Sequence, residues 1–135
     1  KSGSNNSQQQ QVLLIAGYFH ENQKTQDTIT LPDNESVSVL LVRTGEFGST
    51  TVLHRGHLII SGGDGDSSVR IMNPASPRNV LLLPPMRQAR WCHTVIMVSD
   101  FIFICGGDND GEDPLTTECF DLKRPQSGWR TIHGM

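Results

Sequence analysis

The chain has 135 residues, of which 36% are hydrophobic and 19% are charged, a composition typical of a globular domain. Its 14 Asp and Glu residues outnumber its 11 Lys and Arg residues, and the net charge of −3 argues against a general nucleic-acid-binding surface. The longest apolar runs are too short to span a bilayer, and the polar residues 1–11 do not resemble a signal sequence. We therefore expect a protein that binds neither nucleic acid nor membrane.

Residues 1–11 are predicted to form a disordered polar lead-in. After them, eleven short segments of β-branched, aliphatic and aromatic residues alternate with clusters of Gly, Pro, Asn, Asp and Ser. No segment carries the apolar stripe of an amphipathic helix, so the predicted fold class is all-β. The predicted strands are, in chain order, Val12–Ile15, Thr28–Leu31, Val37–Val42, Thr50–Leu53, Leu58–Ile60, Val69–Met72, Val80–Leu83, Thr94–Val98, Phe101–Ile104, Glu118–Leu122 and Arg130–Ile132.

Three of these strands end in the same way, with an apolar run, a small residue and glycine. The final glycines of the three endings, Gly17, Gly63 and Gly107, are spaced 46 and 44 residues apart. A period of about 45 residues holds four short strands and their turns, which is the size of one propeller blade. Glycine is expected at these positions because the strand must bend there with a positive φ and close to neighbouring backbone.

At these positions the sequence resembles the kelch repeat. The middle copy keeps Gly62-Gly63 and Leu83-Pro84-Pro85-Met86, and the first copy keeps only one glycine. The most complete copy is the last one, which contains Arg90, Gly106-Gly107, Phe120-Asp121, Trp129 and Met135.

The resemblance implies a kelch-type β-propeller with about three four-stranded antiparallel blades, at about 12–43, 44–86 and 87–135. Closed kelch propellers usually need about five to seven blades, so this propeller would be incomplete. We expect the remaining blades to come from the same, longer chain or from a second copy.

The resemblance also implies a partner-binding pole, where the loops after the second strand of each blade meet the loops that enter the next blade. Acidic side chains in these loops have two interpretations: turn propensity alone, or an acidic mouth that binds a basic peptide or degron. The loops are Tyr18–Thr25, Thr44–Ser49, Asp64–Ser68, Arg87–Trp91 and Asp108–Thr116. Their carboxylates are Glu21, Glu46, Asp64, Asp66, Asp108, Asp110, Glu112 and Asp113, and their cations are Lys24, Arg87 and Arg90.

Trp91 stands where such a loop enters the innermost strand, and Phe47 is the matching residue one repeat earlier. Trp91 is expected either to anchor a partner or to pack against the adjoining blade, and both alternatives stay open. His93 is expected to be a hydrogen-bonded strand residue, and Phe120 and Trp129 are expected to pack between blades. The predicted partner-binding residues are Phe47, Asp64, Asp66, Arg90, Trp91, Cys92, Asp108 and Asp110.

The function predicted from this resemblance is that of a protein-interaction module in the cytoplasm. Its commonest setting is the substrate receptor of a BTB-kelch cullin-RING ubiquitin ligase, with the cullin held by parts outside this segment. The alternative is a kelch scaffold for cytoskeletal or signalling partners. The three cysteines contain no Cys-x-x-Cys pair, which favours reduced thiols and an intracellular protein.

No catalytic or metal-binding residue and no cofactor is predicted. The acidic run that starts at Asp108 lacks the glycine and the closing glutamate of an EF-hand loop. Copper radical oxidases such as galactose oxidase are also kelch-like propellers, and their crosslinked Tyr and Cys would fall on Trp91 and Phe47. Neither of these residues can supply a tyrosyl–cysteine radical or an oxygen ligand, so we expect no enzyme of this type.

Overall fold

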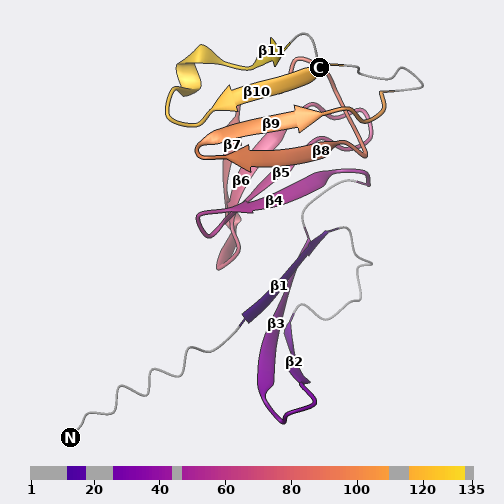
Figure 1. The fold of residues 1–135 in the computed structure, drawn as a ribbon, viewed down its shortest axis with the longest axis vertical. Helices are drawn as coiled ribbons and strands as arrows, with labels where there is room; N and C mark the ends of the chain where they lie inside the picture. The colour runs from indigo at the N-terminus through magenta and orange to yellow at the C-terminus, as the bar shows by residue number, and fades with distance from the viewer. Residues whose placement is uncertain (1–11, 18–25, 44–46, 110–115, 133–135) are drawn as a thin grey trace, which may run out of the picture.

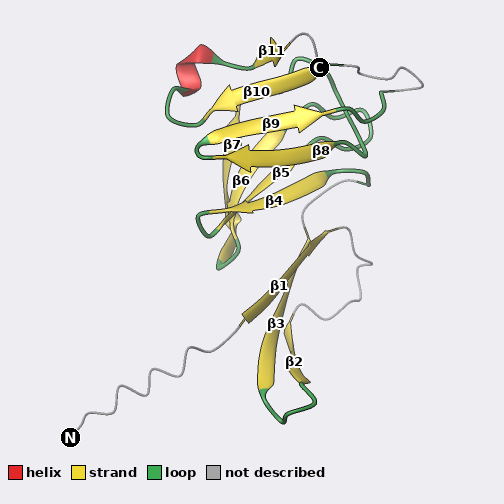
Figure 2. Ribbon diagram, in the orientation of Figure 1, coloured by secondary structure: helices red, strands yellow, loops and turns green. Residues whose placement is uncertain are grey.

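The computed structural model describes residues 12–17, 26–43, 47–109 and 116–132. Within these ranges eleven strands form three sheets, and the only helical element is a single 3-10 turn, η1 (Pro125–Ser127) (Figures 1 and 2). The prediction of an all-β chain is confirmed, and each of the eleven predicted strands overlaps an observed one. The predicted lead-in, residues 1–11, lies outside the described residues.

The second and third sheets are four-stranded and antiparallel, with their strands in chain order, as expected for the second and third repeats. Two-residue turns join the first two strands of each sheet, and Arg55 and Gly56 of the first such turn have positive φ values of 50° and 77°. The second sheet contains β4 (Thr50–His54), β5 (His57–Ser61), β6 (Val69–Asn73) and β7 (Ser76–Leu83). The third contains β8 (Thr94–Val98), β9 (Phe101–Cys105), β10 (Thr117–Asp121) and β11 (Arg130–Ile132).

The first sheet differs from the expected four-stranded antiparallel blade. It contains three strands, β1 (Val12–Gly17), β2 (Gln26–Thr30) and β3 (Ser36–Arg43), in the order β1-β3-β2. A turn in which the Leu31 amide donates to the Glu35 carbonyl at 2.7 Å folds β2 back along β3. Because β2 occupies one edge of β3, β1 pairs with the other edge, and it does so in parallel.

The two four-stranded sheets lie face to face around one apolar core. Strand β9 alternates in the way that a sheet with one covered face requires, with Ile102 and Ile104 fully buried and its other three residues half-buried. The core residues come from strands of both sheets, from the segment after β7 and from the residue before β11: Ile59, Val69, Met86, Ile102, Ile104, Phe120 and Trp129.

The expected packing roles of Phe120 and Trp129 are confirmed. Both side chains belong to the core between the sheets, and their ring centroids are 5.0 Å apart. The indole Nε1 of Trp129 donates to the Pro84 carbonyl at 2.7 Å, which ties the end of the third sheet to the segment that leaves the second.

Candidate functional site

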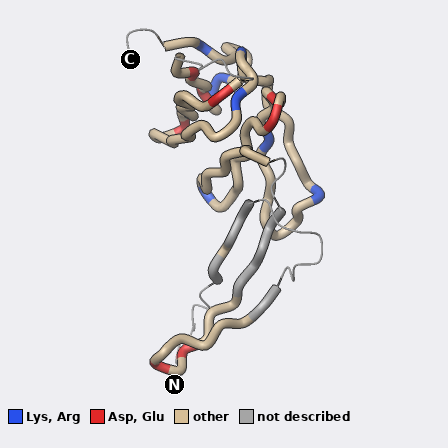
Figure 3. The backbone as a smooth tube through the Cα atoms, turned by 90° about the vertical axis from the view of Figure 1, so that its right-hand side faces the viewer, with Lys and Arg blue, Asp and Glu red and all other residues tan. Residues whose placement is uncertain are grey.

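The candidate site is the end of the two four-stranded sheets where β4 and β8 begin and β5 and β9 end, on the right in Figure 1. We call residues 47–49, 62–68, 87–93 and 106–109 the loop pole. Figure 3 views the chain from this side, with acidic positions in red and basic positions in blue. Of the five predicted loops, Tyr18–Thr25 lies outside the described residues, as do 44–46 and 110–115. Backbone hydrogen bonds bring the described parts of the other four together.

Backbone hydrogen bonds hold the loops of the pole together across large sequence separations. The Asp64 amide donates to the Phe47 carbonyl at 3.1 Å, and the Cys92 amide donates to the Gly48 carbonyl at 2.8 Å. Trp91 and Asp108 exchange two hydrogen bonds, of 3.0 and 2.9 Å. The backbone that carries the side chains of the pole is therefore held in place by hydrogen bonds between its loops.

Phe47 and Trp91 form an aromatic pair at the centre of this network. Their ring centroids are 6.0 Å apart and their planes are tilted by 44°. Phe47 is 61% exposed and Trp91 is half-buried, so the pair presents an apolar surface to solvent. Of the two alternatives for Trp91, packing against the preceding repeat is observed, since its ring lies against Phe47. Anchoring of a partner by Trp91 stays a prediction.

The repeat places these aromatics at equivalent positions, three residues before β4 and before β8. The residues that follow them, Gly48 and Cys92, both have positive φ values, of 81° and 54°. A Cβ atom on Gly48 would lie 2.9 Å from the Cβ of Trp91, so glycine is needed for the two loops to meet. Cys92 adopts the same kind of backbone with an exposed side chain.

The double glycines behave as the sequence predicted. Gly62 has a φ of 67°, and a Cβ atom there would lie 2.3 Å from the Arg90 carbonyl oxygen. Gly107 has a φ of 94°, and a Cβ atom there would lie 2.9 Å from the Trp91 carbonyl oxygen. Both glycines therefore let the ends of β5 and β9 approach the loop that carries Trp91.

The prediction that Arg90 contacts a partner is wrong. Its side chain is 0% exposed, and its Nη2 lies 3.0 Å from the Oε2 of Glu118, which is itself 1% exposed. The Arg90 Nη1 also donates to the carbonyls of Gly106 and Thr116, at 3.1 and 2.6 Å. A guanidinium with this many buried acceptors holds the loops together and cannot reach a partner.

No role was predicted for Glu118, yet its carboxylate holds the loop that contains Arg90. Besides pairing with Arg90, it accepts hydrogen bonds from the amides of Arg87 and Gln88, at 2.6 and 3.3 Å. The signal available in the sequence was a carboxylate at the start of a predicted apolar strand, Glu118–Leu122, where burial of the charge would require a partner.

The carboxylates predicted on the pole have different environments. Asp64 is exposed, whereas the Asp66 carboxylate accepts hydrogen bonds from the amide and the hydroxyl of Ser68, both at 2.8 Å. Asp66 therefore stabilises its own turn. Asp108 is half-buried beside Trp91, and Asp110 lies outside the described residues.

His93 is buried and hydrogen-bonded, as expected for a strand-entry residue. Its Nε2 lies 2.7 Å from the Ser61 hydroxyl oxygen, and its Nδ1 has no hydrogen-bond partner among the described residues. Burial, reinforced by the nearby Arg90 charge, lowers the pKa of His93 from 6.5 to about 4. The imidazole is therefore neutral at physiological pH.

The opposite end of the two sheets carries an ion-pair cluster around Asp100. Its carboxylate lies 3.2 Å from Arg55, 3.2 Å from Lys123 and 3.3 Å from His54. A hydrogen bond from Lys123, aided by His54 and Arg55, lowers the pKa of Asp100. Because Arg55 and His54 belong to the second sheet and Asp100 to the third, this cluster joins the sheets at the end remote from the loop pole.

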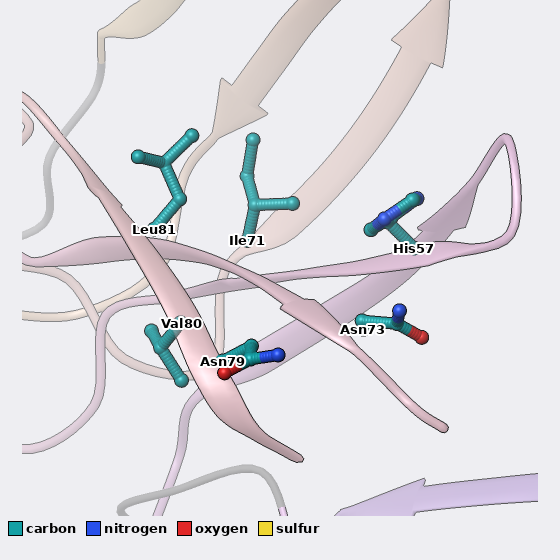
Figure 4. A pocket seen from close by; sticks show the side chains of 6 residues that line it. All are labelled: His57, Ile71, Asn73, Asn79, Val80 and Leu81. Carbon is teal, nitrogen blue, oxygen red and sulfur yellow. The ribbon is translucent and has the colours of Figure 1, made fainter. Parts of the chain in front are cut away.

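A hollow of about 500 Å³ lies on the outer strands of the second sheet (Figure 4). Among the described residues that line it, His57 is the only titratable side chain, so these residues offer no acid–base pair. In the part of the chain that the structure describes, no group of three metal-ligating side chains is found. The hollow is lined by His57, Ile71, Asn73, Asn79, Val80 and Leu81.

Comparison with known proteins bears on the fold alone. No family model and no curated protein matches the chain. Among 79 matching chains of solved structures, the one described as "Structure of YjhT" has a kelch-type propeller fold, a TM-score of 0.55 and 12% sequence identity. The match covers 64% of this chain and 27% of that one, so this chain corresponds to about a quarter of its length.

Within the described residues no helix is long and apolar enough to cross a membrane.

Proposed function

We propose that this chain is part of a kelch-type β-propeller and that its loop pole binds a protein or peptide partner. The period of glycines, the two four-stranded sheets and the structural similarity to a kelch-type propeller all support the architecture. The observation that carries the binding function is the Phe47–Trp91 pair, with ring centroids 6.0 Å apart at the junction of the two repeats.

The pair has the properties of an interface anchor. Aromatic side chains bury a large area at a low cost in conformational entropy, and they are enriched among the residues that dominate binding energies. The backbone on which they stand is fixed by the hydrogen bonds of Gly48, Asp64 and Asp108, so little ordering is needed when a partner binds.

Binding is favoured over catalysis because of the residue types at the site. Phe47 and Trp91 stand side by side where the copper radical oxidases would have their crosslinked Cys and Tyr, but neither residue carries a phenol or a thiol. Cys92 is the exposed thiol next to the pair, and its backbone is turned into the left-handed region by a φ of 54°.

Selection of peptides from a random displayed library on the immobilised chain tests the proposal. Peptides that bind the loop pole should lose about 30-fold or more in affinity when Phe47 and Trp91 are both changed to alanine. The Leu82→Ala variant is the matched control, since Leu82 is an equally apolar side chain, 69% exposed on β7. Selected peptides that bind the double variant as tightly as the original chain would refute the proposal.

The setting as a BTB-kelch substrate receptor rests on the sequence resemblance alone. Recovery of a cullin with the protein isolated from its own cells would support this setting. Co-sedimentation with actin, without a cullin, would support the scaffold instead.

A further inference from the structure

Strand β7 is an uncovered edge of the second sheet. It stands last in the order β4-β5-β6-β7, and within the described residues no backbone hydrogen bond reaches its outer side. From Val80 to Leu83 it pairs with β6 in a regular antiparallel register. Every second residue of such a strand directs its N–H and C=O groups away from the neighbouring strand, so these groups can pair with a further strand.

The side chains of this edge are apolar on both faces of the sheet. Val80, Leu81 and Leu82 are 38%, 61% and 69% exposed. Figure 4 shows the Val80 and Leu81 side chains leaving β7 on opposite sides. Natural proteins usually protect an exposed edge with charges, with proline or by keeping the strand short. β7 has eight residues, and its segment 79–83 contains neither a charge nor a proline, so this edge is suited to pairing.

The hollow of about 500 Å³ borders the same strand. Asn79, Val80 and Leu81 line it from β7, and Ile71, the register partner of Leu81, lines it from β6. Side chains of adjacent strands lie next to each other on the same face of a sheet. A strand added to β7 can therefore place an aliphatic side chain against Leu81 at the rim of the hollow.

Arg78 supplies a charge at one end of this edge. Its side chain is exposed, and within the described residues it forms no ion pair. β7 itself contains no carboxylate. A carboxylate on the strand next to β7 would form a cross-strand pair of opposite charge with Arg78, which stabilises the pairing of strands.

We propose that β7 binds an extended segment of a partner protein, which adds to the second sheet as an antiparallel strand. The segment has consecutive aliphatic or β-branched residues opposite Val80–Leu82 and a carboxylate opposite Arg78. Main-chain hydrogen bonds supply the affinity of such strand addition, and the side chains along the edge supply its selectivity. This surface is formed by other residues than the loop pole, so the inference goes beyond the proposed function and does not depend on it.

A synthetic peptide with the sequence Ser-Thr-Val-Ile-Val-Thr-Glu, acetylated and amidated at its ends, provides the test. In antiparallel pairing its glutamate falls opposite Arg78 when its isoleucine is opposite Leu81. Binding is followed by NMR through the hydrogen exchange of the β7 amides. At saturation the peptide should slow exchange by about tenfold or more at alternate residues of 79–83, and the amides that already donate to β6 should not change.

N-methylated forms of the peptide test whether its main chain makes the contact. One form is methylated on the nitrogens of both valines, and the other on the nitrogen of the isoleucine. One of the two should lose affinity at least about tenfold and the other should bind like the parent peptide, because only alternate N–H groups face β7. Equal effects of the two methylation patterns would overturn the proposal.

A charge exchange tests the chemistry of the partner. Arg78→Glu should weaken the peptide by about threefold to tenfold, and a peptide with lysine in place of its glutamate should regain that affinity on the variant. Arg124→Glu, the same change at an exposed arginine before η1, is the matched control and should leave affinity unchanged. If Arg78→Glu affects both peptides no more than the control does, the acidic partner is refuted.

The free chain provides the last comparison. If the β7 amides are already protected without peptide, and the protection is lost on dilution, a second copy covers the edge and the proposal fails. If the peptide leaves exchange at β7 unchanged, the proposal also fails. Neither result bears on Phe47 and Trp91, so the proposed function of the loop pole is judged by its own experiment.

Discussion

The Nη2 of Arg90 lies 3.0 Å from the Oε2 of Glu118, and both side chains are almost completely excluded from solvent, at 0% and 1% exposure. This pair connects the loop that carries Trp91 to β10, and Arg90 also donates to the carbonyls of Gly106 and Thr116. The loop pole is therefore held by a buried ion pair. Loss of either partner would leave the other charge buried without a counter-charge, which is strongly destabilising.

Removal of one partner of this pair should strongly destabilise the chain. We expect Arg90→Ala to lower the free energy of unfolding by about 3–5 kcal/mol, because the Glu118 carboxylate would remain buried without its counter-charge. Urea denaturation provides the measurement. The matched control is Arg78→Ala, at an exposed arginine of β7, which should change stability by less than about 0.5 kcal/mol. Equal effects of the two substitutions would contradict the role assigned to Arg90.

His93 should make stability depend on pH in a defined window. Its pKa is lowered to about 4 in the folded chain, so below pH 6.5 the unfolded chain binds a proton that the folded chain does not. Stability should therefore fall as the pH drops from about 6.5 to about 4, with a slope of at most about 1.4 kcal/mol per pH unit from this group, and should gain nothing above 6.5.

His93→Gln should flatten this part of the pH profile in urea denaturation series. The lowered pKa of Asp100 acts in a separate window. Its stabilising effect is lost as the pH falls from the ordinary aspartate pKa of 3.8, which applies to the unfolded chain, through the lower pKa of the folded chain. A profile for His93→Gln that still falls between pH 6.5 and 4 as the original does would refute this assignment.

Alanine substitutions at Gly62 and Gly65 can be compared directly, because both glycines have the same φ of 67°. The two sites differ in how closely neighbouring backbone approaches them. A Cβ atom on Gly62 would lie 2.3 Å from the Arg90 carbonyl oxygen, whereas at Gly65 nothing lies within 4 Å. Gly65→Ala should cost only the left-handed backbone penalty, about 1–2 kcal/mol. Gly62→Ala should cost about 1–3 kcal/mol more in the free energy of unfolding, because the neighbouring loop must shift. Equal costs would show that the loops do not meet as described.

The outward face of the third sheet should make the chain self-associate. Ile96 and Val98 on β8 are 48% and 56% exposed, and Phe103 on β9 is half-buried beside Phe101. The residue of the second sheet equivalent to Phe103 is Ile59, which is 1% exposed in the core between the sheets. The same type of sheet surface is therefore covered in one repeat and uncovered in the next.

Sedimentation velocity across a concentration series tests this prediction. The Ile96→Lys, Val98→Lys double variant should associate at least about tenfold more weakly than the original chain, because each lysine would be buried in the contact. Gln126→Lys, an exposed change of charge in η1, serves as the control and should associate like the original. An original chain that stays monomeric at all concentrations would contradict the prediction.

Local signals in the sequence predicted a large part of this structure. The β-branched and aromatic segments between turn residues identified all eleven strands, because alternation and turn propensity act over a few residues. The spacing of 44 residues between Gly63 and Gly107 predicted that Phe47 and Trp91 are equivalent, and the structure places their rings 6.0 Å apart.

The same local patterns could not predict the order of strands in the first sheet. The residues of β1 have the same apolar ending as β5 and β9, yet β1 pairs in parallel with β3. Which edge of a strand remains available depends on the β2–β3 hairpin, and pairing across such separations is set by the assembled sheet.

By itself the sequence determined the all-β class, the repeat length and the position of the aromatic pair, since these depend on residue type and spacing. Only the tertiary structure decided that Arg90 is buried and that Asp64 remains exposed beside Phe47. An arginine in a loop has the same sequence pattern whether it faces solvent or a buried carboxylate. The difference is made by Glu118, 28 residues away, whose position on β10 is known only when the sheet is formed.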